Sequence, residues 1–301
     1  TITSTGTRAR LFMKMPSGIH SHSDPADGFS EIIAHEALEE ARIMGPTSEA
    51  SVLGAADSID AAVELMNKYG VARLNNVVPR ETVKAVLAEV NQKLKVAQED
   101  GDESAFGGVL GRENRYDVLL DPADRATLSA TQAVQGALKG PLGELFRRLG
   151  LDSDAPIHEF SSIVSDPGSQ RQNLHSDTEY HSQPVLFTVF LALQDIEKTM
   201  GPTLFLLGTH RKDAHELFQA RGAAKQRLVE TTPRVANALN AGDVAIYDSR
   251  LLHAGGENNS DRRRVMLYFS IANPRADFNM YEERSIAPAA KGRYTIGKLE
   301  N

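Results

Sequence analysis

The stretch AGDVAIYDSRLLHAGGENNSDRRRVMLYFSI, residues 241–271, decides the fold predicted for this chain. It contains two short apolar runs, over residues 243–247 and 265–271, and each is bounded by turn residues, as is typical of buried strands. His253 lies between the runs, before a Gly-Gly turn, and Arg264 opens the second run. A strand that carries His253, a tight turn and a return strand that carries Arg264 would bring both side chains to the mouth of one β barrel.

Upstream of this stretch, helical patterns come first and strand patterns follow. Apolar residues at helical spacing predict helices over residues 58–69, 80–98 and 128–149, the last broken at Gly140-Pro141. Apolar runs of strand length predict strands over residues 71–78, 157–164, 184–193 and 203–207. This order predicts an α+β protein, mainly β with flanking helices, in which an antiparallel core carries the helices on its outside.

Composition divides the chain into an arm and one domain. Residues 1–56 are rich in Ser, Gly, Pro, Ala and His, with one helical patch over residues 29–44, and are predicted to form an N-terminal arm. Residues 57–301 are predicted to form a single domain, because a chain of 301 residues suffices to bury one sizeable core with helical additions.

Charge and residue usage exclude several kinds of site. The chain has no cysteine, which excludes disulfides, zinc-thiolate sites, iron–sulfur clusters and cysteine nucleophiles. The formal net charge is -7, from 33 basic and 40 acidic side chains, so we expect no nucleic-acid and no membrane partner. No apolar run reaches the roughly 18 residues of a membrane span. We expect a cytoplasmic protein, with a removed targeting segment as the alternative because the chain begins at Thr1.

The tripeptide His175-Ser176-Asp177 is the first candidate for metal binding. Residues i and i+2 of an extended strand point to the same side, so His175 and Asp177 can present a nitrogen and a carboxylate oxygen to one ion. With His253 they would complete the two-histidine, one-carboxylate set of non-haem Fe(II) oxygenases. A second copy, His22-Ser23-Asp24, lies in the predicted arm without a neighbouring strand, and we interpret it as a solvated loop.

In order and spacing, these residues resemble the phytanoyl-CoA dioxygenase-like family of Fe(II)/2-oxoglutarate-dependent oxygenases. The matching pieces are His175-Ser176-Asp177, the stretch GPTLFLLGTHR at residues 201–211, Gly242-Asp243, His253-Ala254-Gly255, and Arg264 eleven residues past His253. The resemblance covers roughly residues 57–275. It implies a double-stranded β-helix core, also called a jelly roll, of cupin-like architecture.

The resemblance also implies a cofactor and two co-substrates, namely Fe(II), 2-oxoglutarate and O2. It implies that Arg264 binds the far carboxylate of 2-oxoglutarate, and that Asn173 and Thr203 help. Arg262 and Arg263 directly precede Arg264, and spacing together with strand alternation favours Arg264 over its neighbours.

Five residues are candidates for contact with the substrate. Arg112, Arg115 and Tyr116 lie in a segment that packs over the active site in similar enzymes, and the two arginines favour a small polar metabolite such as a carboxylate. A salt-bridged surface loop is the alternative for this segment. Tyr180 and His181 follow the first metal motif closely, and either line the substrate site or form a polar loop.

The expected reaction is an oxygenation, because halogenases of this type lack the carboxylate that Asp177 supplies. The sequence does not separate hydroxylation, desaturation and oxidative cyclisation of a natural product or an amino-acid derivative. One alternative is a metal-dependent cupin of a non-oxygenase class, an isomerase or a hydrolase, which would not need Arg264. A catalytically inactive binding module is a second alternative, against which the intact ligand set argues. The sequence predicts no oligomeric state.

Overall fold

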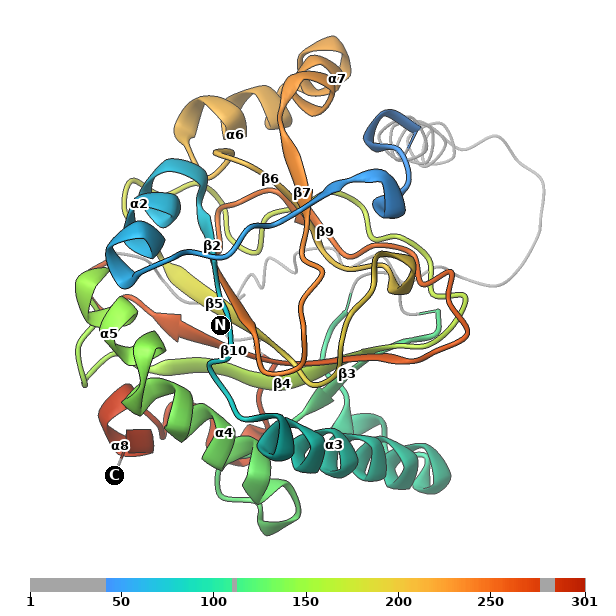
Figure 1. Cartoon of the computed structure of the whole chain (residues 1–301), viewed down its shortest axis with the longest axis vertical. Helices are drawn as coiled ribbons and strands as arrows, with labels where there is room; N and C mark the ends of the chain where they lie inside the picture. The colour runs from blue at the N-terminus through green and yellow to red at the C-terminus, as the bar shows by residue number, and fades with distance from the viewer. Residues whose placement is uncertain (1–41, 110–112, 277–284, 301) are drawn as a thin grey trace, which may run out of the picture.

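The computed structural model describes residues 42–109, 113–276 and 285–300 (Figure 1). Its α-helices are α2 (Ile59–Tyr69), α3 (Arg80–Asp100), α4 (Leu128–Lys139), α5 (Pro141–Arg148), α6 (Lys212–Gln219), α7 (Gly222–Thr231) and α8 (Ile296–Glu300). Its strands are β1 (Ser51–Val52), β2 (Val71–Leu74), β3 (Arg115–Leu119), β4 (Ile157–Ser165), β5 (Leu186–Ala192), β6 (Leu204–Leu206), β7 (Arg234–Ala236), β8 (Val244–Asp248), β9 (His253–Ala254) and β10 (Arg264–Ala272). No helix in these ranges is both long and apolar enough to cross a membrane.

The strands form two sheets that face each other. The major sheet has six strands in the order β2-β8-β5-β10-β4-β3, and all of its pairs are antiparallel. The minor sheet has the order β1-β7-β6-β9, in which only the short β1 pairs parallel to its neighbour. An apolar cluster lies between the sheets, with Phe190 and Met266 from the major sheet and Phe205 from the minor sheet. This is the predicted jelly-roll arrangement of two sheets with flanking helices.

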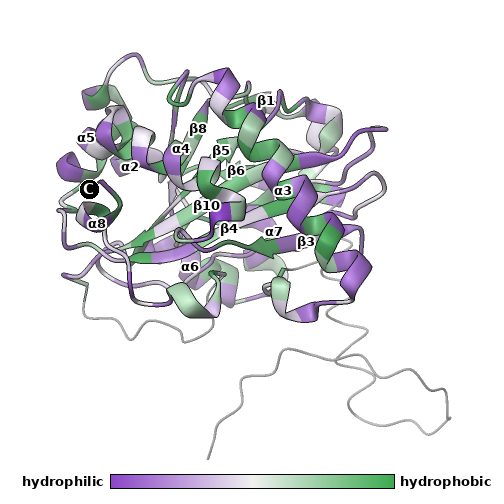
Figure 2. Cartoon of the chain, turned by 90° about the horizontal axis from the view of Figure 1, so that it is seen from below, coloured by the Kyte–Doolittle hydropathy of each residue, from purple (hydrophilic) through white to green (hydrophobic). Residues whose placement is uncertain are grey.

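Helices cover the outer face of the major sheet. Figure 1 shows α3, α4 and α5 along the side of this sheet opposite β6, β7 and β9. The largest apolar cluster joins these helices to alternate residues of the strands, for example Val90 and Leu138 to Phe269. In the view of Figure 2, the strands behind the helices are largely coloured as hydrophobic. The main core of the protein therefore lies between the helices and the major sheet.

Strand β10 is buried along its whole length but has two different faces. Alternate residues of a strand point to opposite sides. Val265, Leu267, Phe269 and Ile271 belong to the helix-covered core. The residues between them, Arg264, Met266, Tyr268 and Ser270, face the minor sheet. The polar residues among the second set are the first structural sign of a site between the sheets.

Local sequence accounts for several element boundaries. Ser58 caps α2 by accepting a hydrogen bond from the backbone N–H of Ala61, and Gly70 ends the helix with φ of 79°, in agreement with general N-cap and C-cap preferences. The predicted break between α4 and α5 is confirmed at Gly140-Pro141, because a proline at the first position of a helix lacks the N–H that would continue the preceding one.

The structure corrects one predicted strand. Strand β2 ends at Leu74 and does not extend to residue 78, because Asn76 adopts the left-handed conformation with φ of 54° and turns the chain. Strands β3 and β7 and helices α6 to α8 were not predicted. Residues 51–52 of the predicted arm pair with β7 in the minor sheet, and most of the predicted helix over residues 29–44 lies outside the described residues.

Candidate metal and co-substrate site

Three backbone pairings bring the predicted metal ligands together. His253 lies on β9, and His175 forms a two-way bridge with it, in which each backbone N–H donates to the other residue's carbonyl, at 3.0 and 2.8 Å. The Asp177 N–H donates to the Ser249 carbonyl at 2.9 Å. The segment that follows β8, which contains Ser249 and His253, therefore holds His175 and Asp177 at the edge of the minor sheet.

The donor atoms of His175, Asp177 and His253 lie within 4.8 Å of one another. Asp177 Oδ1 is 3.4 Å from His253 Nε2 and 3.9 Å from His175 Nε2. The two imidazole rings are tilted against each other, with centroids 4.4 Å apart. Two nitrogens and one oxygen on one side of a common point fit a non-haem iron centre with open positions.

Each donor atom is oriented by a hydrogen bond to another atom of its side chain. His175 Nδ1 donates to the Asn173 carbonyl at 2.8 Å, and His253 Nδ1 donates to the Leu251 carbonyl at 2.9 Å. A carbonyl only accepts, so both protons lie on Nδ1 and both Nε2 lone pairs point to the shared site. Tyr247 donates to Asp177 Oδ2 at 2.9 Å, which leaves Oδ1 for a metal.

Electrostatics keep this group ready for a cation. Burial, and then the neighbouring His253, lower the pKa of His175 to about 4, so its ring is neutral at neutral pH and able to bind metal. Burial raises the pKa of Tyr247 well above its ordinary value, and the Asp177 carboxylate adds to this. Tyr247 therefore stays protonated and remains a hydrogen-bond donor to Asp177.

A buried guanidinium forms the second half of the site. Arg264 is 1% exposed, and its Nη2 donates to Ser165 Oγ at 2.9 Å while Nη1 lies 3.4 Å from the Met200 carbonyl. Its Nε has no hydrogen-bond partner among the described residues. Burial, and then the charge of Arg115, lower the pKa of Arg264 to about 9. A buried cation whose acceptors in the described part of the chain are all neutral fits an anionic ligand such as a carboxylate.

The structure separates Arg264 from the two arginines that precede it. Arg262 reaches outward to Glu197, and both side chains are more than half exposed. Arg263 forms a bidentate ion pair with Asp166. Only Arg264 of these three points between the sheets, as strand alternation predicted.

Arg115 lies beside Arg264 on the same inner face. Strand register places Arg115 opposite Ser165, and Ser165 opposite Arg264. Arg115 Nε donates to Ser165 Oγ at 3.2 Å, and Nη2 donates to the Gly256 carbonyl at 3.1 Å. Burial lowers the pKa of Arg115 to about 10. Tyr116 points to the opposite face, where its ring lies 5.9 Å from that of Phe106 and packs on the helix-covered core, so the structure does not bring it to the site.

The two polar residues predicted beside Arg264 differ in placement. Thr203 is buried and directly precedes β6 on the minor sheet. Asn173 is exposed, and its contact with the site is made by its backbone carbonyl. The neighbouring Gln172 turns inward instead, and its Oε1 accepts from the Gly255 N–H at 2.8 Å.

The remaining substrate candidates lie at the periphery or outside the described residues. Arg112 is one of the residues that the structure does not describe. The Tyr180 ring packs 5.7 Å from His215 and 5.9 Å from the Arg250 guanidinium. The His181 carbonyl accepts a hydrogen bond from Arg250 Nη1 at 2.5 Å. Both residues thus belong to a loop that Arg250 holds in place.

Sequence reasoning missed a group of polar residues on the inner face of the major sheet, toward the end that lies away from Arg264. Glu159 accepts a hydrogen bond from Ser270, its cross-strand partner on β10. Asp117 accepts from Tyr268 at 3.0 Å and from Ser161 at 2.5 Å. The signal was the share of polar residues in IHEFSSIVS, which is unusually high for a strand that is buried on both faces.

Comparison with known proteins identifies the family. A family model described as phytanoyl-CoA dioxygenase (PhyH) matches residues 66–266, more than half of the chain. The chain therefore belongs to the phytanoyl-CoA dioxygenase family, as the sequence resemblance predicted. Its class is that of iron- and 2-oxoglutarate-dependent dioxygenases, so the enzyme class and the cofactors are confirmed and the non-oxygenase cupin is not favoured.

Two curated relatives match most of the chain at low identity. The iron/alpha-ketoglutarate-dependent dioxygenase ausU of Aspergillus calidoustus is 25% identical over 229 residues, which cover 70% of this chain and 71% of that protein. The dioxygenase olcK of Penicillium canescens is 22% identical over 243 residues, which cover 77% of this chain and 76% of that protein.

Solved structures share the fold. The non-heme alpha ketoglutarate dependent epimerase SnoN from nogalamycin biosynthesis superposes with a TM-score of 0.54 at 18% identity, over 74% of this chain and 85% of SnoN. The carbocyclase SnoK from the same biosynthesis gives 0.53 at 20% identity, over 73% and 87%. AviO1 from Streptomyces viridochromogenes Tue57 gives 0.54 at 20% identity, over 75% and 100%.

Proposed function

We propose that His175, Asp177 and His253 hold Fe(II), and that Arg264 binds the far carboxylate of 2-oxoglutarate. Fe(II) with 2-oxoglutarate and O2 supplies an oxidant for unreactive C–H bonds, and 2-oxoglutarate is converted to succinate and CO2. The protein's own part is to orient the three donor atoms, to bury the arginine and to exclude water from the space between them.

One observation carries this proposal. The inner space holds a two-histidine, one-carboxylate set and, on the facing sheet, a buried guanidinium whose Nε lacks a partner among the described residues. A metal-dependent isomerase or hydrolase would use the first feature but would have no use for the second. A buried cation without an anion is costly, and a dicarboxylate that also reaches the metal would offset that cost.

Arg115 belongs to the co-substrate end of the site in this proposal. It shares Ser165 with Arg264 and contacts the carbonyl of Gly256, one of the two glycines that follow His253-Ala254. Two neighbouring guanidiniums repel each other, and a bound carboxylate would relieve that repulsion. We therefore propose that Arg115 supports binding of 2-oxoglutarate and does not contact the substrate.

We propose that the substrate is a small polar natural product that is neutral or cationic. The expected carboxylate depended on Arg112 and Arg115, and Arg115 lies at the co-substrate end. Glu159 and Asp117 face the minor sheet farther along the strands, and acidic groups disfavour an anion. SnoN, which has been solved with Fe3+, alpha ketoglutarate and nogalamycin RO, supports a natural product as the substrate class.

Succinate formation tests the oxygenase proposal. Purified protein receives Fe(II), ascorbate, O2 and 2-oxoglutarate, with and without candidate substrates. We expect succinate from the wild type, more of it with a true substrate, and none from His175→Ala. Absence of succinate under every condition, together with bound zinc or manganese in place of iron, would favour the non-oxygenase cupin.

Arg264→Ala separates the two metal-dependent classes. Arg262→Ala is the matched control, because Arg262 is two residues away and exposed. We expect Arg264→Ala to retain iron and lose 2-oxoglutarate turnover, and Arg262→Ala to retain both. Equal turnover in the two variants would show that Arg264 is not needed to bind 2-oxoglutarate.

A further inference from the structure

We propose that Asn237 is a further 2-oxoglutarate-binding residue, which donates its side-chain amide to the carboxylate held by Arg264. This inference rests on the proposed function and extends its binding site to strand β7. Nothing in the sequence motifs points to Asn237, which directly follows β7 (Arg234–Ala236). Four features of Asn237 support the inference. Its side chain faces the space between the sheets, it lies in the row of the minor sheet nearest the two buried arginines, it is fully buried, and its backbone is fixed by hydrogen bonds.

Strand alternation places Asn237 between the two sheets. Leu204 pairs with Ala236, and both belong to the apolar cluster on the far side of the minor sheet. Phe205 pairs with Val235, and both belong to the cluster between the sheets. The next pair continues this alternation, because the Asn237 N–H donates to the Thr203 carbonyl at 2.8 Å. Asn237 and Thr203 therefore lie side by side and face inward.

The inner face of the minor sheet has two adjacent rows. The first row contains Val235, Phe205 and the metal ligand His253. The second row is displaced by two residues on each strand and contains Asn237, Thr203 and Gly255.

Both buried arginines approach the end of the minor sheet that carries the second row. Arg264 Nη1 lies 3.4 Å from the carbonyl of Met200, three residues before Thr203. Arg115 Nη2 donates to the carbonyl of Gly256, one residue after Gly255. A Cβ atom at Gly255 would lie only 2.4 Å from Gln172 Oε1, so a side chain at this position would displace Gln172. The second row thus faces the predicted carboxylate with Asn237 and Thr203.

The Asn237 amide is buried without a partner. Its side chain is 0% exposed, and neither Oδ1 nor Nδ2 has a hydrogen-bond partner among the described residues. Buried amides are nearly always hydrogen-bonded, because leaving one unpaired is costly. A carboxylate would accept from Nδ2 and also from the partnerless Nε of Arg264. The Thr203 hydroxyl, beside Asn237 on the same inner face, is a further candidate donor to the same carboxylate.

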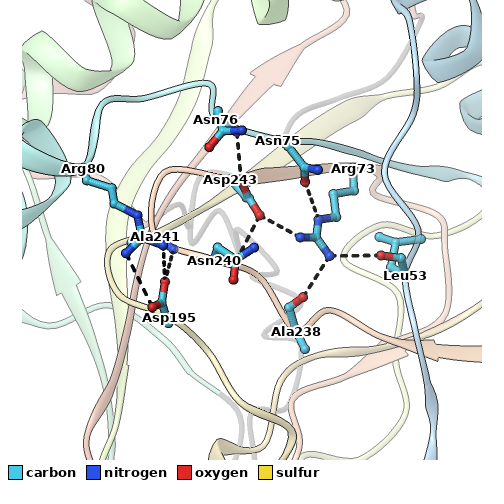
Figure 3. Close-up of polar contacts among 10 residues, drawn as sticks. All are labelled: Leu53, Arg73, Asn75, Asn76, Arg80, Asp195, Ala238, Asn240, Ala241 and Asp243. Carbon is cyan, nitrogen blue, oxygen red and sulfur yellow. Dashed lines mark hydrogen bonds and ion pairs between the residues drawn. The ribbon is translucent and has the colours of Figure 1, made fainter.

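The backbone on both sides of Asn237 is fixed. On one side it pairs with β6, as described above. On the other side, Arg73 Nη1 donates to the Ala238 carbonyl at 3.1 Å, and Arg73 Nη2 forms a buried ion pair with Asp243 at 2.7 Å (Figure 3). Asp243 also accepts from the Asn240 N–H at 3.1 Å (Figure 3). The backbone that carries the amide is therefore held in place before a ligand arrives, which favours a preorganised donor.

The test measures binding without turnover. Under anaerobic conditions, 2-oxoglutarate is titrated into Fe(II)-loaded protein, and the visible charge-transfer band of the chelate gives the Kd. A parallel titration uses 2-oxovalerate, in which a methyl group replaces the far carboxylate. The variants are Asn237→Leu, which removes the amide at similar size, and Asn237→Ala, which avoids any steric clash. The matched control is Asn240→Leu, because Asn240 lies in the same loop with its side chain exposed.

We expect both Asn237 variants to weaken 2-oxoglutarate binding roughly 10- to 100-fold, as for a lost hydrogen bond to a charged group. We expect no change in 2-oxovalerate binding and no change in the control. The melting temperature of ligand-free Asn237→Leu should not fall, because an unpaired amide is replaced by an apolar group.

Equal 2-oxoglutarate affinity in wild type and both Asn237 variants would overturn the assignment. An equal loss for both ligands would also overturn it, because that result indicates a general distortion. A wild type that binds iron but not 2-oxoglutarate would instead overturn the proposed function itself, and the role of Asn237 with it.

Discussion

The two faces of strand β10 differ in purpose although both are buried. One face carries Val265, Leu267, Phe269 and Ile271 and packs under the helices. The other carries Arg264, Met266, Tyr268 and Ser270 and faces the minor sheet. On the first face burial removes apolar surface from water and stabilises the fold. On the second face it desolvates charges, which costs stability and is explained by a function.

The first prediction concerns the inner face and has the largest expected effect. His253→Ala should lower succinate production by more than about 100-fold, because even residues that only support a metal ligand contribute 10- to 100-fold. The folded structure should persist, since the substitution leaves the backbone pairing of residue 253 with Phe205 and His175 in place. Iron content and circular dichroism measure both effects. Wild-type iron content and turnover in His253→Ala would show that the metal binds elsewhere.

The second prediction concerns the outer face of the same strand. Phe269 is 1% exposed, and Phe269→Ala should lower the free energy of unfolding by about 3–5 kcal/mol through lost burial and a cavity. The folded fraction should bind iron as the wild type does. Denaturant unfolding and iron titration check this pair of results. A large loss of iron affinity in folded protein would show that the two faces are not independent.

The third prediction uses the pH dependence of Glu159 on the inner face. Burial raises its pKa from 4.5 to about 7, so the folded state holds a proton that the unfolded state has lost in this range. The free energy of unfolding should therefore fall as pH rises from about 4.5 to about 7, by at most about 3 kcal/mol.

Glu159→Gln should remove this slope, because glutamine does not titrate. Glu81→Gln, at an exposed position of α3, is the control and should leave the slope unchanged. Chemical unfolding at several pH values measures it. The same slope in Glu159→Gln as in the wild type would assign the titration to another group.

The fourth prediction has the smallest expected effect. Tyr247→Phe removes the hydrogen bond to Asp177 Oδ2 and leaves the ring in its aromatic cluster with Phe190 and Phe205. Iron affinity should fall about 10-fold, at the lower end of the range for residues that orient metal ligands. Competition with a chelator gives the affinity. Unchanged affinity would mean that Asp177 is oriented by its backbone alone.

The sequence predicted the site residues that lie in or beside strands with clear apolar runs. It missed site residues whose local sequence has no such run. The metal candidates and Arg264 come from strands and turns with clear apolar patterns, so alternation and spacing placed them together. Strand β3 was missed because its inner face carries Arg115 and Asp117, which make RYDVL look like a surface segment. Asn237 was missed because its significance is a lack of partners, and that is visible only when both sheets are assembled.

The strand pattern also explains the misplaced substrate candidates. Arg115 and Tyr116 are adjacent in sequence, but alternation sends one between the sheets and the other to the helix-covered core. Their grouping as one basic patch ignored the period of a strand. Placing them required the register of β3 against β4, which no local sequence feature supplies.

The most direct test is a crystal structure of the protein grown anaerobically with Fe(II) and 2-oxoglutarate. We expect iron bound by His175 Nε2, Asp177 Oδ1 and His253 Nε2, with 2-oxoglutarate extending from the iron to the guanidinium of Arg264. Iron at another position, or a co-substrate whose far carboxylate lies away from Arg264, would contradict it.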